Sequence, residues 1–417
     1  MGNIVVGQSG GPTAAINSSL TGVIKGGLYF NVPKIYGMRN GIEGFMKGDI
    51  IDLKDAFPNY EGLSVLRRTP ASFLGTCRYK LPPCEGNEEI YETIFQRMEE
   101  KDITALLYIG GNDSMDTIQS LSDYAASHGK PQRFIGIPKT IDNDLPVTDH
   151  TPGYGSAAKF IATMTKEIIR DTESFGGSKS PKISIVEIMG RNAGWLTAAS
   201  ALSRAKDCVG PDLIYFPELD FDKDDFLSRV DALAGKKKSI VICASEGIHG
   251  KAGALLSEDS AGLDAFGHSQ LSGAGRVLGD MIKNGLGLKN RTIEFSILQR
   301  CASHLASGTD IDEAFNVGFE AVRAAENGET GRMITINVEQ REPYIANYKA
   351  ADIHGIANEE KRLPLTWITP DGVNVTDEFL EYARPLIDGY CYPHYANGVP
   401  KHVTLYNANM EESGKIE

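Results

Sequence analysis

A loop near the middle of the chain carries side chains suited to moving a charged group. From Lys139 to Asp144 it reads Lys-Thr-Ile-Asp-Asn-Asp, which places one cation, one hydroxyl, one amide and two carboxylates within six residues. One carboxylate could accept a proton while the other holds a metal ion, and the lysine could neutralise an anion during its transfer. Taken alone, the loop is equally compatible with a polar surface turn that contains a capping aspartate.

A second polar turn lies earlier in the chain, at residues 110–114, which read Gly-Gly-Asn-Asp-Ser. It follows the apolar run 103–109, just as the first loop follows the apolar run 133–137, and it precedes an expected helix over 114–126. Paired glycines let backbone N–H groups approach a phosphate, and a helix N-terminus favours negative charge. Because open α/β sheets bind ligands outside the carboxyl ends of their strands, two such turns at successive strand ends indicate an anion site.

The two turns resemble the signature motifs of the phosphofructokinase family, a glycine turn of the form GGD-[GD]-S and a loop of the form P-[GK]-TIDND. The loop motif is complete at residues 138–144. Lys139 stands at its variable position, where the ATP-dependent branch has glycine, and so resembles the pyrophosphate-dependent branch. The resemblance runs over most of residues 2 to about 340, and the order and spacing of the motifs also agree.

The resemblance implies a transferase of glycolysis that moves phosphate reversibly from pyrophosphate to the 1-hydroxyl of fructose 6-phosphate, giving fructose 1,6-bisphosphate. An ATP-dependent 6-phosphofructokinase is the alternative. A sugar-phosphate-binding regulator without catalysis is a different class, but the presence of both Lys139 and Asp142 speaks against it, because binding alone needs no base. A nicotinamide dehydrogenase shares the alternating strand and helix pattern, yet its G-x-G-x-x-G fingerprint is missing from this sequence.

The resemblance also assigns roles to individual residues. Asp142 is expected to be the catalytic base, with Lys139 and Thr140 beside the transferring group. The residues expected to bind the donor phosphates are Gly10, Gly11, Arg78, Gly111 and Asp113. The residues expected to bind the sugar phosphate are Thr140, Asp142, Asp144, Lys182, Met189, Gly190, Arg191, Glu246, Arg291 and Arg300.

Two of these cations imply an oligomer. Lys182 and Arg291 match residues that reach the 6-phosphate of the sugar bound by a neighbouring subunit, so a homodimer or homotetramer is expected. Lys182 replaces the more usual arginine, so its phosphate contact would be a point charge rather than a fork.

Mg²⁺ is the cofactor that the resemblance implies, with Asp113 as its expected ligand. Asn112 stands where the family usually has an aspartate beside the magnesium, which leaves Asp113, Asp142 or the substrate itself to hold the ion. A second departure from the family pattern is Ile297, which replaces a histidine near the sugar phosphate.

Apolar runs and helical spacing between the motifs predict an α/β fold. Strands are expected at 4–6, 32–36, 103–109, 133–137, 183–188, 213–216, 239–244 and 292–298. Helices are expected at 14–29, 87–101, 114–126 and 153–172, and residues 40–70 are expected to be irregular with possible short strands. Strands that alternate with helices favour parallel sheets.

The elements fall into two clusters, before about residue 150 and after about residue 180. This arrangement predicts two Rossmann-like lobes with mostly parallel sheets and an active site in the cleft between them. Residues 1–150 with about 300–350 are expected to form a phosphoryl-donor lobe. Residues 151–299 with about 351–417 are expected to form a sugar-phosphate lobe and a C-terminal extension, with a linker at 359–364.

The composition limits the classes of partner. The chain has 417 residues, with 42 Lys and Arg against 55 Asp and Glu, and its net charge of −13 argues against non-specific binding to nucleic acid or to an anionic membrane. No run of about 18 apolar residues predicts a membrane span, and the start does not resemble a signal peptide, so a cytoplasmic enzyme is expected. Six scattered cysteines without a CxxC pair indicate reduced thiols.

Overall fold

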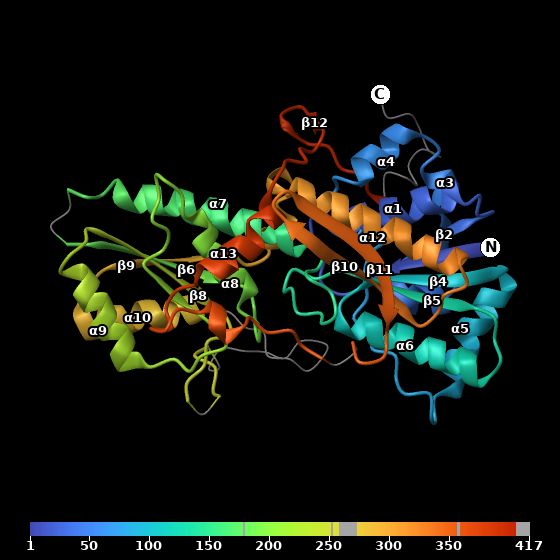
Figure 1. Ribbon diagram of the computed structural model, residues 1–417, viewed down its shortest axis with the longest axis horizontal. Coiled ribbons are helices and arrows are strands. Elements are labelled where there is room, and N and C mark those ends of the chain that lie inside the picture. The colour runs from blue at the N-terminus through green and yellow to red at the C-terminus, as the bar shows by residue number, and fades with distance from the viewer. Residues whose placement is uncertain (178–179, 252, 258–272, 357–358, 406–417) are drawn as a thin grey trace.

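The chain folds into two α/β lobes that lie side by side, as Figure 1 shows. The computed structural model describes residues 1–177, 180–251, 253–257, 273–356 and 359–405. Residues 406–417, which belong to the predicted C-terminal extension, lie outside this description. No helix within the described stretches is long and apolar enough to span a membrane. The predicted α/β fold with mostly parallel sheets is confirmed.

The lobe that contains the N-terminus is built on a seven-stranded sheet of order β11-β10-β5-β4-β1-β2-β3. Its strands are β1 (Asn3–Gln8), β2 (Ile35–Met38), β3 (Ile50–Asp52), β4 (Ile103–Gly110), β5 (Arg133–Pro138), β10 (Arg332–Arg341) and β11 (Tyr344–Asp352). The edge strands β3 and β11 are antiparallel to their neighbours, and the other pairs are parallel. The carboxyl ends of β1, β4 and β5 therefore meet at the same end of the sheet, which brings together the turns that follow them.

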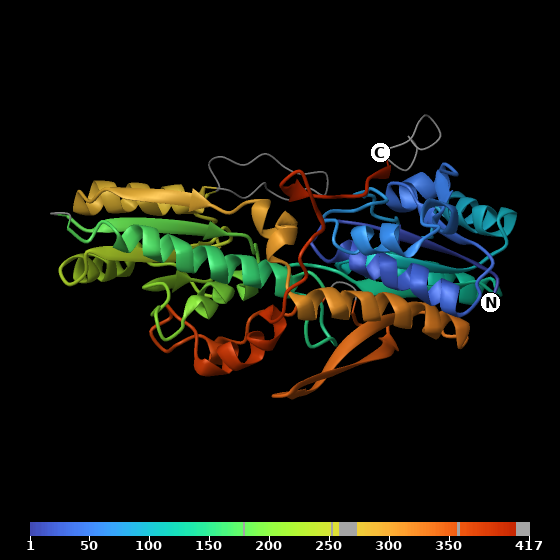
Figure 2. The same ribbon diagram turned by 90° about the horizontal axis from the view of Figure 1, so that it is seen from above.

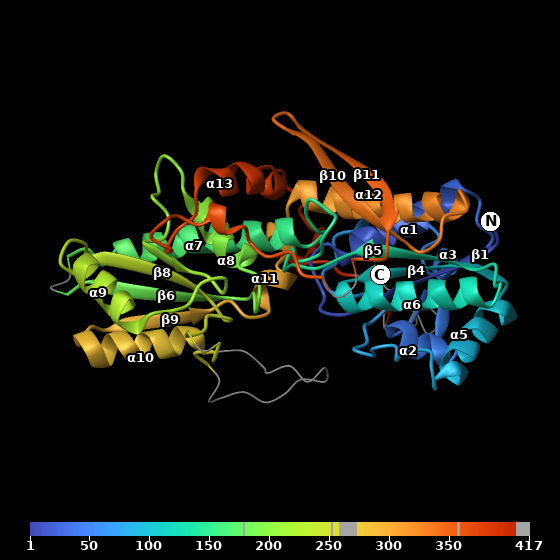
Figure 3. The same ribbon diagram turned by 60° about the horizontal axis from the view of Figure 1, so that its bottom comes forward.

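Helices cover both faces of this sheet (Figure 3). They are α1 (Ile16–Tyr29) and α12 (Gly308–Glu326) on one face, and α5 (Glu88–Glu100) and α6 (Asn112–Ser127) on the other. Along β1, Ile4 and Val6 lie in the core on the α1 side, whereas Val5 lies in the core on the α6 side. Because a strand buried on both faces needs apolar residues at every position, these strands appear in the sequence as continuous apolar runs.

The second lobe is built on a four-stranded parallel sheet of order β7-β8-β6-β9. Its strands are β6 (Lys182–Ile188), β7 (Leu213–Tyr215), β8 (Ser239–Ser245) and β9 (Asn290–Glu294). Its helices are α7 (Tyr154–Glu173) and α8 (Trp195–Ala199) on one face, and α9 (Lys223–Ala234) and α10 (Ala274–Leu286) on the other. Ile185 and Val186 of β6 belong to the cores on opposite faces, so this sheet is also buried on both sides.

Shorter elements complete the two lobes. The remaining helices and strands are α2 (Gly41–Met46), α3 (Leu53–Ala56), α4 (Tyr60–Leu66), α11 (Leu298–Cys301), α13 (Asp377–Ala383), β12 (Tyr395–Ala396) and β13 (Val399–Pro400). Residues 40–70, which were expected to be irregular, therefore contain three of the helices and β3. The side chains of Asp52 and Asn59 cap α3 and α4 by accepting hydrogen bonds from backbone N–H groups, which explains why such short helices form there.

Two expected strands are wrong at their ends. The strand expected at 292–298 stops at Glu294, because Ser296 has a φ of 43° that ends the extended chain before α11. The strand expected at 32–36 is displaced to β2, which begins after Pro33, a residue that cannot donate to a strand ladder.

The chain passes between the lobes more than once. After β9, helix α12 returns the chain to the first lobe, where β10 and β11 extend the sheet as a long hairpin (Figure 3). Helix α13 then packs into the core of the second lobe. The last described segment crosses back (Figure 2), and its His394 Nε2 lies 3.0 Å from Ser64 Oγ. How the residues divide between a donor lobe and a sugar lobe stays a prediction.

A buried ionic cluster joins the loop after β5 to α12 and to the β10–β11 hairpin. His150 is 1% exposed, with Nδ1 2.9 Å from Asp149 Oδ1 and Nε2 2.6 Å from Glu313 Oε2. Arg341 donates to the second Asp149 oxygen at 2.7 Å, and the Tyr344 hydroxyl donates to the second Glu313 oxygen at 2.6 Å. Burial lowers the pKa of His150, but attraction to Glu313 and Asp149 outweighs it and raises the pKa to about 9.

We expect His150→Gln to lower the free energy of unfolding most at the acidic end of the range in which the protein is folded. Since the pKa of His150 rises from 6.5 to about 9 on folding, its stabilising charge is fully present below about pH 6.5 and is lost as the pH rises through about 9. A shift of this size corresponds to about 3 kcal/mol. Urea unfolding of both proteins from about pH 6 to about pH 10 measures it, and a difference that does not change with pH would contradict the charged histidine.

Candidate active site

The turn after β1 meets the loop after β5 at Lys139. Gly10 has a φ of 75°, a left-handed conformation that favours glycine, and Gly11 follows it. Lys139 is only 3% exposed, and its Nζ donates to the Gly11 carbonyl oxygen at 2.7 Å. Its backbone N–H donates to the carbonyl of Gly110, at the end of β4, at 2.9 Å. Lys139 thus connects the carboxyl ends of β1, β4 and β5.

The Lys139 ammonium is a cation held out of water. Burial lowers its pKa to about 8, although the neighbouring charges of Asp142 and Asp144 act in the opposite direction. With this pKa about nine-tenths of the side chain is charged at neutral pH. An anion that enters beside a desolvated cation interacts with it much more strongly than it would in water.

The carboxylates of Asp142 and Asp144 project from the same loop. The Asp142 N–H donates to Thr140 Oγ1 at 3.0 Å, and the Thr140 hydroxyl donates to Asp142 Oδ2 at 3.5 Å. Burial raises the pKa of Asp142, against the opposing effects of Lys139 and Thr140. Burial, together with repulsion from Asp142, raises the pKa of Asp144 to about 7. Carboxylates with a raised pKa are suited to accept a proton near neutral pH.

Asn112 and Asp144 leave two oxygen atoms without partners. Asn112 Nδ2 donates to Asp144 Oδ2 at 3.3 Å. The amide oxygen of Asn112 and the other carboxylate oxygen of Asp144, Oδ1 in both, are buried and have no hydrogen-bond partner among the described residues. A buried acceptor without a partner costs free energy, and oxygen atoms of this kind are ligands that Mg²⁺ prefers. Sequence reasoning treated Asn112 only as a lost ligand.

Asp113 and Arg78 are exposed residues near the first-lobe turns. The Asp113 side chain is 52% exposed, and its Oδ1 lies 4.0 Å from Lys80 Nζ. Arg78 follows Cys77, whose carbonyl accepts a hydrogen bond from the Gly10 N–H at 3.4 Å. The structure therefore places Arg78 next to the glycine turn and Asp113 at the surface at the start of α6.

The second lobe contributes the turn after β6 and the turn after β8. Gly190 N–H donates to Glu246 Oε1 at 3.3 Å, so the two turns are in contact. Gly247 fits this junction closely, because a Cβ there would lie 1.8 Å from the Arg191 carbonyl oxygen. Met189 N–H donates to the side chain of Gln299 at 3.4 Å, which joins α11 to the same turn.

Charged groups of one lobe change the pKa values of groups in the other lobe. Burial raises the pKa of Glu246 to about 7, and the charge of Asp142 in the other lobe adds to the shift. Arg300, on α11, lies against the first glycine turn, since a Cβ on Gly11 would be 3.1 Å from its Nη1. The charge of Arg300 adds to the lowering of the pKa of Lys139 and opposes the rise in the pKa of Asp142. Asp142, Glu246 and Arg300 are thus close enough for their charges to interact.

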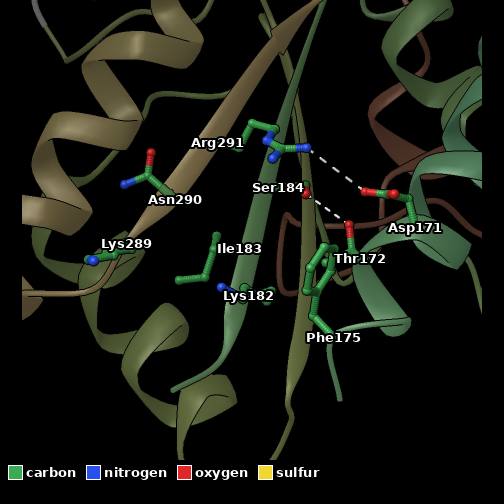
Figure 4. A pocket seen from close by; sticks show the side chains of 9 residues that line it. All are labelled: Asp171, Thr172, Phe175, Lys182, Ile183, Ser184, Lys289, Asn290 and Arg291. Atoms are coloured by element: carbon green, nitrogen blue, oxygen red, sulfur yellow. Dashed lines mark hydrogen bonds and ion pairs between the residues drawn. The ribbon is translucent and has the colours of Figure 1, made fainter. Parts of the chain in front are cut away.

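Lys182 and Arg291 lie elsewhere, at the amino ends of β6 and β9. They line a hollow of about 160 Å³ (Figure 4). The amino ends of these strands lie at the opposite end of the sheet from the turn after β6. Arg291 Nη1 lies 4.0 Å from Asp171 Oδ2, and Lys182 Nζ lies 5.3 Å from the centre of the Phe175 ring. Within one chain the structure does not bring these two cations to Asp142.

Two residues of the C-terminal segment contact the Asp142 loop and were not predicted. The Asn143 amide donates to the Tyr382 hydroxyl at 2.8 Å. Lys361 Nζ donates to the Asp149 carbonyl at 2.8 Å, and burial lowers the pKa of this lysine to about 8. The stretch 359–364, which was predicted to be a linker, contains no helix or strand, and Leu363 within it is buried. No local motif marks either residue, so only the three-dimensional fold reveals them.

The chain has extensive similarity to known proteins. The family model described as Phosphofructokinase matches residues 3–325. The chain is 41% identical over 411 residues to the pyrophosphate--fructose 6-phosphate 1-phosphotransferase of Halomonas elongata, which covers 98% of this chain and 97% of that protein. It is 39% identical over 407 residues to the protein of the same name from Methylococcus capsulatus, covering 97% of this chain and 96% of that protein.

A solved structure shares the whole arrangement. The pyrophosphate-dependent phosphofructokinase from Nitrosospira multiformis superposes with a TM-score of 0.87 at 38% sequence identity. The superposition covers 96% of this chain and 95% of that chain, so it includes both lobes.

We expect Gly247→Ala to weaken binding of fructose 6-phosphate by about tenfold or more, because the added methyl group forces the turn at Arg191 to move. The affinity for pyrophosphate should change much less. Gly250→Ala is the matched control, since no atom of the described residues lies within 4 Å of a Cβ at that position. Calorimetric titration of both ligands measures the effect, and equal sugar-phosphate affinities of the two variants would contradict the placement.

Proposed function

The chain belongs to the phosphofructokinase family, and we propose that it is a pyrophosphate-dependent member acting in glycolysis in the cytoplasm. It transfers phosphate reversibly from pyrophosphate to the 1-hydroxyl of fructose 6-phosphate, giving fructose 1,6-bisphosphate. The observation that carries this assignment is the buried Lys139 ammonium, which stands where the ATP-dependent branch has glycine. Two relatives that are named for the pyrophosphate-dependent reaction match nearly the full chain. Their similarity favours pyrophosphate over ATP as the donor.

Asp142 is the proposed base. Phosphoryl transfer needs little covalent chemistry from the protein, but it needs positioning and neutralisation of charge. Burial of Asp142 raises its pKa, so its carboxylate is suited to take the proton of the attacking hydroxyl. No histidine occurs in the strand-end motifs that could act in its place. Lys139 and Arg300 would offset the charge on the moving phosphoryl group.

Mg²⁺ fits the oxygen atoms that lack partners. Asn112 Oδ1 and Asp144 Oδ1 would hold the ion, which supplies positive charge to the phosphates when bound. Over the described part of the chain, no three His, Cys, Asp or Glu residues gather into a metal site. This suits Mg²⁺, which usually binds through one or two carboxylates together with waters and substrate phosphates. Asp113 was the expected ligand, but it pairs with Lys80 at the surface, so we propose Asp144 with Asn112 instead.

The active unit is proposed to be an oligomer. Lys182 and Arg291 line a basic hollow remote from the Asp142 loop of their own chain. A neighbouring subunit could bring the 6-phosphate of its sugar to these two cations. Each active site would then contain residues of two chains.

We expect Asp142→Asn to reduce kcat by about 10²- to 10⁴-fold, which is the usual contribution of a general base. Binding of fructose 6-phosphate should change far less, because the amide keeps the shape of the side chain. Asp280→Asn, at an exposed position on α10, is the control. Steady-state kinetics with calorimetric titration separates the two effects, and a variant that keeps more than about a tenth of wild-type kcat would rule out this base.

We expect Lys139→Gly to lose most pyrophosphate turnover, because it removes the buried cation. Asp113→Gly, alone or combined with Lys139→Gly, should improve the use of ATP relative to pyrophosphate, since the Asp113 charge repels an α-phosphate. The ratio of kcat/KM for the two donors is the measurement. Full pyrophosphate turnover in Lys139→Gly would contradict the role of the lysine.

We expect two inactive variants to complement each other. Mixing and refolding an Arg291→Ala chain with an Asp142→Ala chain should restore some activity, because hybrid oligomers contain sites with both native residues. Each variant refolded alone is the control. If sedimentation showed that the fully active wild-type protein is a monomer, the proposal that two chains share each active site would be wrong.

A further inference from the structure

A segment beyond the family match packs against the loop that carries Asp142. The family model ends at residue 325, whereas residues 359–363 follow the β10–β11 hairpin and form no helix or strand. This stretch is nevertheless anchored, since Leu363 is 2% exposed and its N–H donates to Glu218 Oε1 at 3.1 Å. At its centre lies Lys361.

The backbone of Lys361 connects the two lobes. Its N–H donates to the Asp144 carbonyl at 2.7 Å, in the loop after β5 of the first lobe. Its carbonyl accepts a hydrogen bond from Trp195 Nε1 at 2.9 Å, at the start of α8 in the second lobe. One residue therefore spans the junction at the edge of the proposed site.

The side chain of Lys361 meets the same loop a second time. Its Nζ donates to the carbonyl oxygens of Asp149 at 2.8 Å and Thr148 at 3.1 Å, and to Asn143 Oδ1 at 3.4 Å. The ammonium also lies 5.3 Å from the centre of the Trp195 ring, a distance that allows a cation–π contact. An ammonium has three donors, and these three acceptors match all of them.

The loop from Asp142 to Asp149 requires stabilising contacts of this kind, because two of its residues have unfavourable backbone conformations. Asn143, between the two carboxylates, has a φ of 56°, and Val147 has a φ of 69°. A left-handed conformation is unfavourable at non-glycine positions and is most unusual for a β-branched residue. Such a conformation persists only where surrounding contacts hold it, and the contacts of Lys361 flank both residues.

We propose that Lys361 is a positioning residue, whose ammonium holds the loop from Asp142 to Asp149 in the shape that directs the two carboxylates into the active site. The segment after the family match thereby completes the catalytic machinery. The inference rests on the proposed function for its kinetic consequence. The geometric part, that Lys361 orders the loop, stands on the hydrogen bonds alone.

Hydrogen exchange tests the geometric part without any activity. In Lys361→Met, which keeps the stem but removes the charge, amide exchange of peptides covering residues 140–149 should rise by about tenfold or more. Peptides from β4 should keep their wild-type exchange. Lys236→Met removes an exposed lysine and is the matched control, with no change expected. Unchanged exchange of the loop would overturn the proposal, and so would an equal rise throughout the protein.

Steady-state kinetics tests whether Lys361 affects turnover. Lys361→Met should lower kcat by about 10- to 100-fold, because a small displacement of the base is costly, while KM for pyrophosphate should change little. Lys361→Arg keeps the charge and should recover part of kcat, and ethylammonium added to Lys361→Ala should do the same. A kcat of Lys361→Met within about threefold of wild type would overturn the proposal, as would a loss that neither arginine nor ethylammonium relieves.

These two readouts also separate this proposal from the proposed function. If the wild-type protein had no pyrophosphate-dependent activity, the proposed function would fail, and the exchange of residues 140–149 would still decide whether Lys361 orders the loop. If the wild type were active and Lys361→Met matched it in both kcat and loop exchange, only the Lys361 proposal would fail.

Discussion

The burial of one ammonium group constrains the whole active site. Removing a cation from water costs several kcal/mol unless nearby groups compensate, and Lys139 is only 3% exposed. The Gly11 carbonyl accepts its hydrogen bond, and the charges of Asp142 and Asp144 favour its protonated form. Gly11 follows β1, whereas the two aspartates follow β5, so this arrangement requires the ends of β1 and β5 to lie close together. The parallel order of the first sheet satisfies this requirement.

Several carboxylates near Lys139 are themselves buried and have raised pKa values. Burial raises the pKa values of Asp144 and Glu246 to about 7, and it also raises that of Asp142. Substrate phosphates add more negative charge, which cations beside the site would offset. Arg300 of α11 lies against the first glycine turn, and a metal ion fits the oxygens that lack partners among the described residues. The two lobes therefore depend on each other electrostatically as well as through the segments of chain that cross between them.

The sequence predicted the features that depend on residues close together in the chain. Strands buried on both faces were recognised because they are continuous apolar runs, and the loop at 138–144 was recognised because its residue types are dense and ordered. The edge strand β11 was not predicted because it is only partly buried and rich in polar and alanine residues, so it forms no apolar run in the sequence. Lys361 was missed for a different reason, since its role depends on where the chain returns after the hairpin. The sequence suggests that Asn112 does not bind the metal, because it replaces an aspartate. Its buried oxygen, which has no partner among the described residues, becomes evident only in the structure, as does that of Asp144.

The most direct test compares the phosphoryl donors of the unmodified protein. Initial rates of fructose 1,6-bisphosphate formation would be measured with pyrophosphate and with ATP, at equal Mg²⁺ and saturating fructose 6-phosphate. A buried Lys139 in the position where ATP users have glycine predicts rapid turnover with pyrophosphate and little with ATP. Efficient turnover with ATP and none with pyrophosphate would contradict the account.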